Sequence, residues 1–366
     1  MTTSPGTTAT LTAGSPVEVA RELADRVLRP QAERADTDGV DRAVVDELGR
    51  AGLLGLAGPR GYGGGDAPPP VVREVTEVLA GADGATWFVT TQHLMPLQTL
   101  ASSENVALKE RYLRGMCTGG VLAGIAVAHL RRPGPPAVTA TRVPGGWVLD
   151  GAVGWTTSWG LADVFLLGGL SPAGELVLAL LPAVDAPGLL ASPPMRLAAM
   201  QGTATVSLTV TGLRVAAADV AHVERAADWL EADRTRTANA TPAVFGLLHE
   251  VVARLADTAE RRGDRTAARL AERLADETAE LRRAAYALVD HVRAPEQVAD
   301  RLALRGASLE LVMRAATALV TATGGGAMGL GQAPQRLARE ALFHLVQAQT
   351  GPVREATLAA LLERTA

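Results

Sequence analysis

The chain of 366 residues contains a single cysteine, Cys117. A disulfide within the chain is therefore impossible, and cysteine-rich metal or redox motifs are excluded. The six histidines have no spacing typical of metal ligands, so we predict no metal site. Because nothing in the sequence requires an oxidising compartment, we predict a cytoplasmic location.

Lysine and aromatic residues are also scarce. Lys109 is the only lysine, the net charge is -4, and aromatic residues make up 3% of the chain. Because basic and acidic residues are interleaved, the sequence has neither the basic face nor the stacking side chains of a nucleic-acid-binding protein. The apolar stretch 176–190 is interrupted by Pro182, Asp185 and Pro187, whereas a membrane span needs about 20 continuous apolar residues. We therefore expect no nucleic-acid partner and no membrane partner.

The patterns that are present change twice along the chain. Residues 1–16 are rich in Thr, Ser and Gly, and we predict a disordered leader there. Residues 17–120 have a helical period, in which Ala20, Leu23 and Val27 form an apolar stripe that Pro30 is expected to end. This segment is predicted to be an N-terminal α-helical domain.

Residues 121–225 have the period of β-strands instead. Val206, Leu208 and Val210 alternate with polar residues, and the run Trp147–Gly151 is predicted to be a strand that ends in a tight turn. Helical periodicity returns in residues 226–366, with four long segments that predict an antiparallel four-helix bundle: 228–262, 266–293, 296–323 and 334–364. The predicted fold class is therefore α+β, mostly α, with a central β-barrel or sandwich.

Three segments resemble motifs of the acyl-CoA dehydrogenase family, in the same order and at similar spacing. They are Gly52-Leu53-Leu54-Gly55-Leu56 with the following Pro59 and Tyr62-Gly63-Gly64, then Gly151-Ala152-Val153-Gly154-Trp155-Thr156-Thr157, and finally Gln335-Arg336-Leu337-Ala338-Arg339-Glu340-Ala341. The resemblance implies the acyl-CoA dehydrogenase fold and FAD as cofactor. It also implies binding of FAD between subunits, and hence a homodimer or homotetramer.

The resemblance assigns the flavin to the segment Trp155-Thr156-Thr157. An isoalloxazine needs an apolar ring against one face and hydrogen-bond donors at its edge, and a strand with an indole followed by hydroxyls supplies both. Gly324 and Gly325 resemble a family turn that approaches the dinucleotide part of FAD from a neighbouring subunit, for which glycine suits because it lacks a Cβ. A core tryptophan and an ordinary interhelical loop are the structural alternatives for these two segments.

The sequence departs from the family at the position of the catalytic base. Counting from Arg339, the slot of the glutamate that removes the substrate α-proton falls on Ala348, whose methyl group cannot accept a proton. Asp233 and Glu231 are the nearest acids to the place where some relatives keep the base instead, and we take them as candidate catalytic residues. First-turn acids favoured by the helix dipole are the alternative interpretation.

Several other polar residues fall on segments that line the substrate pocket in this family. Arg131 and His129 lie in the segment where the family has a serine that contacts CoA or substrate and this chain has none. The guanidinium of Arg131 suits a phosphate of CoA or of a carrier protein, with a mobile Pro-rich loop of solvated arginines as the alternative. His93 lies on an N-terminal pocket helix, with a core histidine as the alternative. The remaining candidates precede or flank Ala348: His344, Gln347 and Gln349.

Three functions are compatible with this pattern. The first is α,β-dehydrogenation of an acyl thioester of CoA or a carrier protein, with an electron-transferring flavoprotein or oxygen as acceptor. The second is a flavin-dependent monooxygenase on the same scaffold, which does not need the α-proton base. The third is a subunit without a base that pairs with a paralogue in a heteromeric acyl-CoA dehydrogenase. We take the first as the prediction.

Overall fold

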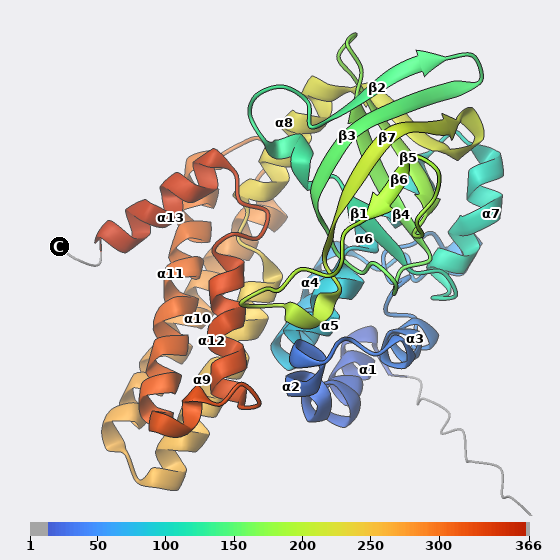
Figure 1. Cartoon of the computed structure of the whole chain (residues 1–366). Helices are drawn as coiled ribbons and strands as arrows, with labels where there is room; N and C mark the ends of the chain where they lie inside the picture. The colour runs from blue at the N-terminus through green and yellow to red at the C-terminus, as the bar shows by residue number, and fades with distance from the viewer. Residues whose placement is uncertain (1–13, 364–366) are drawn as a thin grey trace, which may run out of the picture.

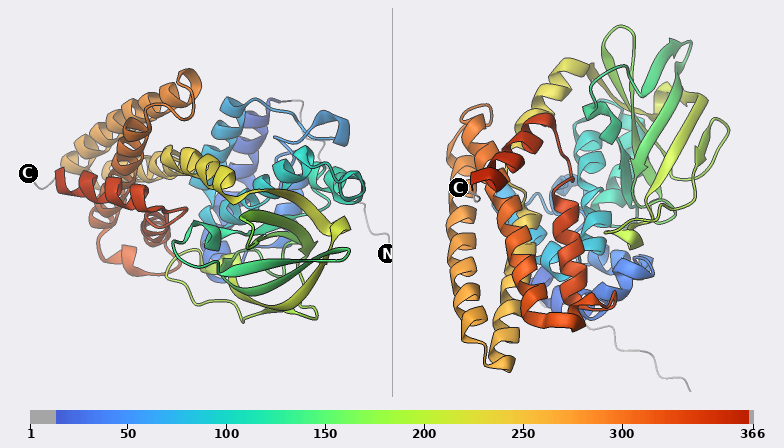
Figure 2. Two further views of the ribbon diagram at one scale, coloured as in Figure 1. Left: turned by 90° about the horizontal axis from the view of Figure 1, so that it is seen from above. Right: turned by 60° about the vertical axis from the view of Figure 1, so that its left-hand side comes forward.

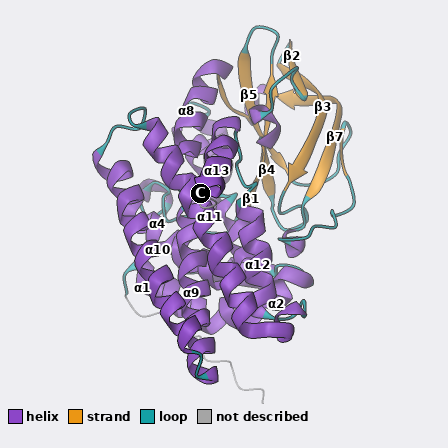
Figure 3. Cartoon of the chain, turned by 90° about the vertical axis from the view of Figure 1, so that its left-hand side faces the viewer, coloured by secondary structure: helices purple, strands orange, loops and turns teal. Residues whose placement is uncertain are grey.

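The computed structural model describes residues 14–363 and has the predicted order of helical, β and helical parts (Figure 1). Most of the predicted leader, residues 1–13, lies outside the described residues. The β domain sits above the N-terminal helices, and the C-terminal helices run alongside both. Figure 3 shows the same separation of helices from strands from a second side. Within the described residues, no helix is long and apolar enough to cross a membrane.

The N-terminal part is helical from its first described turn. Pro30 does not end the first helix as predicted, because a π-helical segment, η1 (Ala24–Leu28), leads directly into α2 (Arg29–Thr37), where Pro30 occupies the first turn and needs no N–H partner. The other N-terminal helices are α1 (Pro16–Leu23), α3 (Arg42–Arg50), α4 (Pro69–Ala82), α5 (Gly84–Thr91), α6 (Leu94–Ser102) and α7 (Val106–Cys117).

The β domain is one mixed sheet in the order β6-β7-β3-β2-β4-β5-β8, with β1 paired to β4 in parallel. Its apolar inner face includes the predicted stripe Val206, Leu208 and Val210 of β7. The strands are β1 (Ala123–Ala126), β2 (Val138–Val143), β3 (Gly146–Thr156), β4 (Val164–Leu170), β5 (Glu175–Pro182), β6 (Leu189–Ala191), β7 (Val206–Ala216) and β8 (Val220–Arg225).

The predicted turn at Gly151 is wrong, because β3 continues through it to Thr156. Gly151 has a φ of 141° at a register shift between β3 and β7, and a Cβ there would lie 2.0 Å from the carbonyl oxygen of Ala137. The glycine therefore forms a bulge within the strand. As a consequence, β3 is long enough to carry Trp155 to the edge of the domain.

The C-terminal helices differ from the four predicted ones at two breaks. The first predicted helix is divided before Pro242 and the last is divided at residues 345–350. The helices are α8 (Ala226–Ala238), α9 (Pro242–Arg262), α10 (Arg265–His291), α11 (Val298–Thr323), α12 (Ala333–His344) and α13 (Gly351–Glu363). Figure 2 shows α9 to α12 as the long bundle, with α8 leading from the β domain into it.

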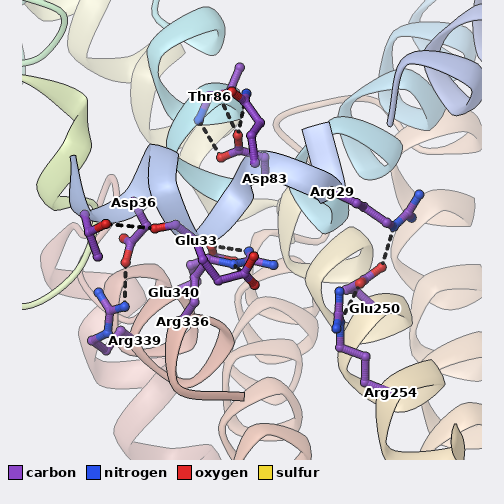
Figure 4. A network of polar contacts seen from close by, with 12 residues as sticks. Arg29, Glu33, Asp36, Asp83, Thr86, Glu250, Arg254, Arg336, Arg339 and Glu340 are labelled. Carbon is purple, nitrogen blue, oxygen red and sulfur yellow. Dashed lines mark hydrogen bonds and ion pairs between the residues drawn. The ribbon is translucent and has the colours of Figure 1, made fainter. Parts of the chain in front are cut away.

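A buried ionic network joins α12 to the N-terminal helices (Figure 4). Arg336, which is 1% exposed, contacts Glu340 at 2.6 Å and Glu33 of α2 at 3.3 Å, and Arg339 contacts Asp36 at 2.5 Å. The Glu340 carboxylate also packs against Gly84 at the start of α5, where a Cβ would lie 2.6 Å from its carboxyl carbon. This network fixes α12, and with it the loop that follows, relative to α2 and α5.

Candidate functional site

The outward side of the end of β3 carries an exposed indole. Trp155 is 48% exposed, whereas its neighbour Thr156 is buried, because successive residues of a strand face opposite sides. The alternative in which Trp155 fills the core of the β domain therefore does not hold. An exposed tryptophan beside unpaired polar groups is a typical feature of a binding surface.

Hydroxyl groups follow Trp155 along the chain. The Thr157 Oγ1 lies 3.1 Å from Thr205 Oγ1, and a hydroxyl with one such bond keeps capacity for another. Thr156 Oγ1 and Ser158 Oγ are buried without a partner among the described residues. Each such group costs about 1–3 kcal/mol when it stays unpaired. A planar ligand with hydrogen-bonding edges, such as an isoalloxazine, fits an exposed indole that is followed on the same side by the Thr157 hydroxyl.

The backbone around this segment is strained. Ser158, Met200 and Ala204 all have positive φ angles, of 70°, 57° and 49°, although none is glycine. They come together because Ser158 N donates to Thr203 O at 2.9 Å and Trp159 N donates to Ala204 O at 3.1 Å. Strained non-glycine residues cost about 1–3 kcal/mol each and concentrate at functional sites, so their meeting here supports the assignment of the site.

The segment after β1 borders the same strand. His129, in the 3-10 helix η3 (Ala128–Arg131), donates from Nε2 to Gly168 O at 2.9 Å, and its Nδ1 has no partner among the described residues. Burial lowers the pKa of His129 to about 4, so the ring is neutral. A Cβ on Gly154 would lie 3.3 Å from Arg132 Nη2, which places this guanidinium beside the strand that carries Trp155.

Arg131 and Asp233, both predicted as site residues, bind each other. The guanidinium of Arg131 donates two hydrogen bonds to Asp233, at 2.8 and 2.9 Å, and Asp233 is 2% exposed. Burial raises the pKa of Asp233, but Arg131 and Arg236 outweigh it and hold the pKa below its usual value. The pair joins η3 to α8. Glu231 is exposed on α8, and its carboxylate lies 3.6 Å from Arg234 Nη1.

The position of the missing base lies in the break between α12 and α13. Ala348 has a φ of 49°, so the chain leaves the helical path there. The buried Arg305 of α11 fixes this loop, because its Nη2 donates to Gln347 O at 2.9 Å and its Nη1 donates to Thr237 O. Burial and the charge of Arg131 lower the pKa of Arg305 to about 10, which still leaves it charged.

A cavity of about 430 Å³ opens beside this loop, and Gln347 lines it. Its walls come from α4, α5, α6 and the start of α9, and include Val72, Trp87, Thr91 and Leu94. Such a volume suits a small ligand. Trp87 and Thr91 could not be predicted as lining residues, because only their place on a helix that the resemblance assigns to the pocket pointed to them.

The other predicted pocket residues have different surroundings. His93 is buried at the end of α5, where its Nδ1 accepts from Ala123 N at 3.0 Å and its Nε2 lies 3.1 Å from Met116 O. Both ring nitrogens are thus used in packing, and burial lowers the pKa of His93 to about 4. Gln349 is exposed and donates to Leu345 O at 2.8 Å. His344 is buried on the last turn of α12.

The glycine turn lies at the start of the 3-10 helix η6 (Gly324–Met328) after α11. Gly324 has a φ of 73°, and a Cβ on Gly325 would meet nothing within 4 Å. Arg262 Nη2 donates to Thr323 O at 2.7 Å, which brings the basic α9–α10 turn beside the glycines. This surface is open to a second molecule. Contact with an FAD of a neighbouring subunit and a plain interhelical loop both agree with this geometry.

Comparisons with known proteins bear on this arrangement. The family model "Acyl-CoA dehydrogenase, N-terminal domain" matches residues 16–120. The chain is 30% identical over 148 residues to benzylmalonyl-CoA dehydrogenase of Aromatoleum aromaticum, a match that covers 39% of each protein. It is 29% identical over 166 residues to dibenzothiophene monooxygenase of Mycolicibacterium goodii, which covers 44% of this chain and 39% of that protein. The matches thus span about two fifths of these relatives.

Solved structures extend the likeness to the whole chain. Butyryl-CoA dehydrogenase from Megasphaera elsdenii superposes with a TM-score of 0.79 at 18% identity, over 95% of this chain and 97% of that one. An FAD complex of PigA gives a TM-score of 0.79 at 16% identity, over 98% and 100% of the two chains. At these identities the superpositions establish the fold. Residues 16–120 thus match the N-terminal domain of acyl-CoA dehydrogenases, and the whole chain has the fold of these solved structures.

Proposed function

We propose that this protein is an FAD-dependent oxidoreductase that carries out α,β-dehydrogenation of an acyl thioester. The observation that carries the proposal is the exposed Trp155 at the end of β3, followed on the same side of the chain by the Thr157 hydroxyl. A flavin ring provides both the apolar face and the polar edge that these side chains require. The cavity beside Gln347 supplies a place for the acyl group.

In this proposal Trp155, Thr156 and Thr157 hold the isoalloxazine, and Gly324 and Gly325 approach the dinucleotide part of an FAD bound to a second copy. Bound FAD supplies a two-electron acceptor for the β-hydride of the substrate. A homodimer or homotetramer in the cytoplasm, an acyl-CoA or acyl-carrier substrate, and an electron-transferring flavoprotein or oxygen as acceptor complete the proposal. The open glycine surface beside Arg262 supports a contribution to a neighbouring subunit.

The chain differs from the acyl-CoA dehydrogenase family at the residue that accepts the α-proton of the substrate. Asp233 is ionised, as a base must be, but its lowered pKa makes it a weak one and its oxygens are held by Arg131. Glu231 points to solvent. If a paralogue completes the site instead, the chain will bind FAD stoichiometrically only when it is co-expressed with that partner.

One observation favours a second candidate function, a flavin-dependent monooxygenase. Oxygenation at a flavin needs no base for an α-proton, and Ala348 provides none. The similarity to dibenzothiophene monooxygenase points in the same direction. In this candidate the same cavity holds a substrate without a thioester, and reduced flavin is supplied from outside the chain.

Absorbance spectra of the purified holoprotein separate these candidates. Under anaerobic conditions, dehydrogenation predicts that an acyl-CoA or acyl-carrier thioester bleaches the flavin. Monooxygenation predicts no bleaching, but oxygen uptake that depends on added reduced flavin. A flavin that no acyl thioester bleaches would overturn the first candidate, and absence of oxygen uptake would overturn the second.

A further inference from the structure

Two buried rings that contact each other, one of which lines the cavity, carry polar atoms without partners among the described residues. Trp87 of α5 is 4% exposed and His344 of α12 is 3% exposed. The ring centroids are 5.5 Å apart, with an angle of 38° between the planes. Neither Trp87 Nε1 nor His344 Nδ1 has a hydrogen-bond partner among the described residues. Two unsatisfied nitrogens thus lie on adjacent side chains from separate parts of the sequence.

Packing alone does not explain these two nitrogens. The neighbouring pair Phe88 and Phe343 fills space with rings 4.6 Å apart and without polar atoms. An unpaired buried donor or acceptor costs about 1–3 kcal/mol, and this cost disappears when a ligand atom supplies the partner. Trp and His at such positions are therefore better explained by binding than by core formation.

The cavity reaches Trp87 from the loop of Ala348. Trp87 lines both the cavity of about 430 Å³ and a smaller apolar one of about 60 Å³, and Val72, Thr91 and Leu94 are shared by the two. Gln347 lines the large cavity on the side of the loop. A ligand whose reacting end lies near this loop can therefore extend its other end to Trp87.

The hydrogen-bonding capacity of the two rings determines which kind of ligand atom they can bind. Trp87 Nε1–H can only donate. His344 is neutral, since burial and then the charge of Arg305 lower its pKa to about 3. A neutral imidazole nitrogen either donates or accepts, depending on the tautomer. A hydroxyl oxygen can accept from Trp87 and donate to His344, and a carbonyl oxygen can accept from both rings.

We propose that Trp87 and His344 together bind an oxygen atom in the acyl part of the substrate, so that the preferred substrates are acyl thioesters with a hydroxyl or carbonyl group away from the thioester. The inference rests on the proposed function, because it assigns the cavity to the acyl group. It goes beyond that function by specifying oxygenated acyl groups, which a purely apolar cavity would not prefer. A buried water between the rings is the competing occupant.

The test is calorimetric titration of the holoprotein with two matched pairs of thioesters. The pairs are ω-hydroxyhexanoyl-CoA with hexanoyl-CoA, and para-hydroxyphenylpropionyl-CoA with phenylpropionyl-CoA. We expect the oxygenated member of at least one pair to bind about 5- to 10-fold more tightly, the ratio that one net hydrogen bond provides. Trp87→Phe keeps the ring, removes the N–H and is expected to abolish that preference, and His344→Leu is expected to reduce it.

A matched control is Trp147→Phe, which changes a tryptophan of equal burial in the core of the β domain. It is expected to keep the preference. Equal affinities for both members of each pair in the wild type, the result for a trapped water, would overturn the inference while the proposed function stands. An unchanged preference in Trp87→Phe would also overturn it. Failure of every thioester to bind would overturn the proposed function as well.

Discussion

The pair Arg131–Asp233 allows a direct choice between a structural and a catalytic role for Asp233. Asp233→Asn leaves Arg131 without its partner in a largely buried position. Breaking a buried ion pair from one side costs about 3–5 kcal/mol. Because the side chain of Arg131 is 20% exposed and regains some water, we expect the lower end, a loss of about 3 kcal/mol in the free energy of unfolding.

Urea unfolding followed by tryptophan fluorescence measures this loss. Trp229 of α8 packs with the apolar cluster against the β domain and reports on the contact that the pair secures. The folded-state pKa of Asp233 is depressed, so the pair contributes its stability above the unfolded value of 3.8 and loses it as pH falls through the folded value. The difference between wild type and Asp233→Asn should therefore shrink in strong acid.

Glu231→Gln serves as the control, because this exposed residue should change stability by less than about 0.5 kcal/mol. A double-mutant cycle with Arg131→Met and Asp233→Leu isolates the coupling within the pair. If Asp233→Asn unfolds like the wild type but no longer bleaches its flavin with an acyl thioester, the structural interpretation is refuted and Asp233 is the base.

Three further predictions concern Glu340, Ala348 and His93. Burial outweighs Arg336 and raises the pKa of Glu340 to about 7, so wild-type stability should fall as pH rises from about 5 to about 8. Urea midpoints of Glu340→Gln should lack this fall, and a parallel pH profile would refute the assignment. Ala348→Gly should raise the free energy of unfolding by about 1 kcal/mol by relieving the left-handed backbone, and an unchanged urea midpoint would contradict this. His93→Leu should cost about 1–3 kcal/mol, because Ala123 N loses its acceptor while Met116 O keeps the bond from Gly119 N; unchanged stability would contradict that role.

The order of the helical, β and helical parts could be predicted from the sequence, because hydrophobic periodicity is a property of short segments. Val206, Leu208 and Val210 lie on one face of β7 and are buried as their alternation predicted. Trp155 and Thr157 could be placed at the end of a strand by resemblance to a motif, although the length of β3 depended on the bulge at Gly151, which pairing with β7 and the approach of Ala137 determine.

Contacts between distant segments could not be derived in this way. Arg131 and Asp233 are 102 residues apart, and nothing local to Asp233 indicates that its oxygens are already bound. The break at Ala348 depends on Arg305, whose side chain binds the carbonyl oxygen of Gln347 from another helix. Trp87 and His344 belong to helices from the two ends of the chain, so their proximity appears only in the folded structure.

The central claim is that a flavin ring lies against Trp155. Titration of apoprotein with FAD, followed by flavin absorbance and tryptophan fluorescence, tests it most directly. The account predicts stoichiometric binding by the wild type and affinity lower by about 3- to 10-fold in Trp155→Ala, the value of one aromatic contact. No binding of FAD by the wild-type protein, or equal affinity of Trp155→Ala and wild type, would contradict it.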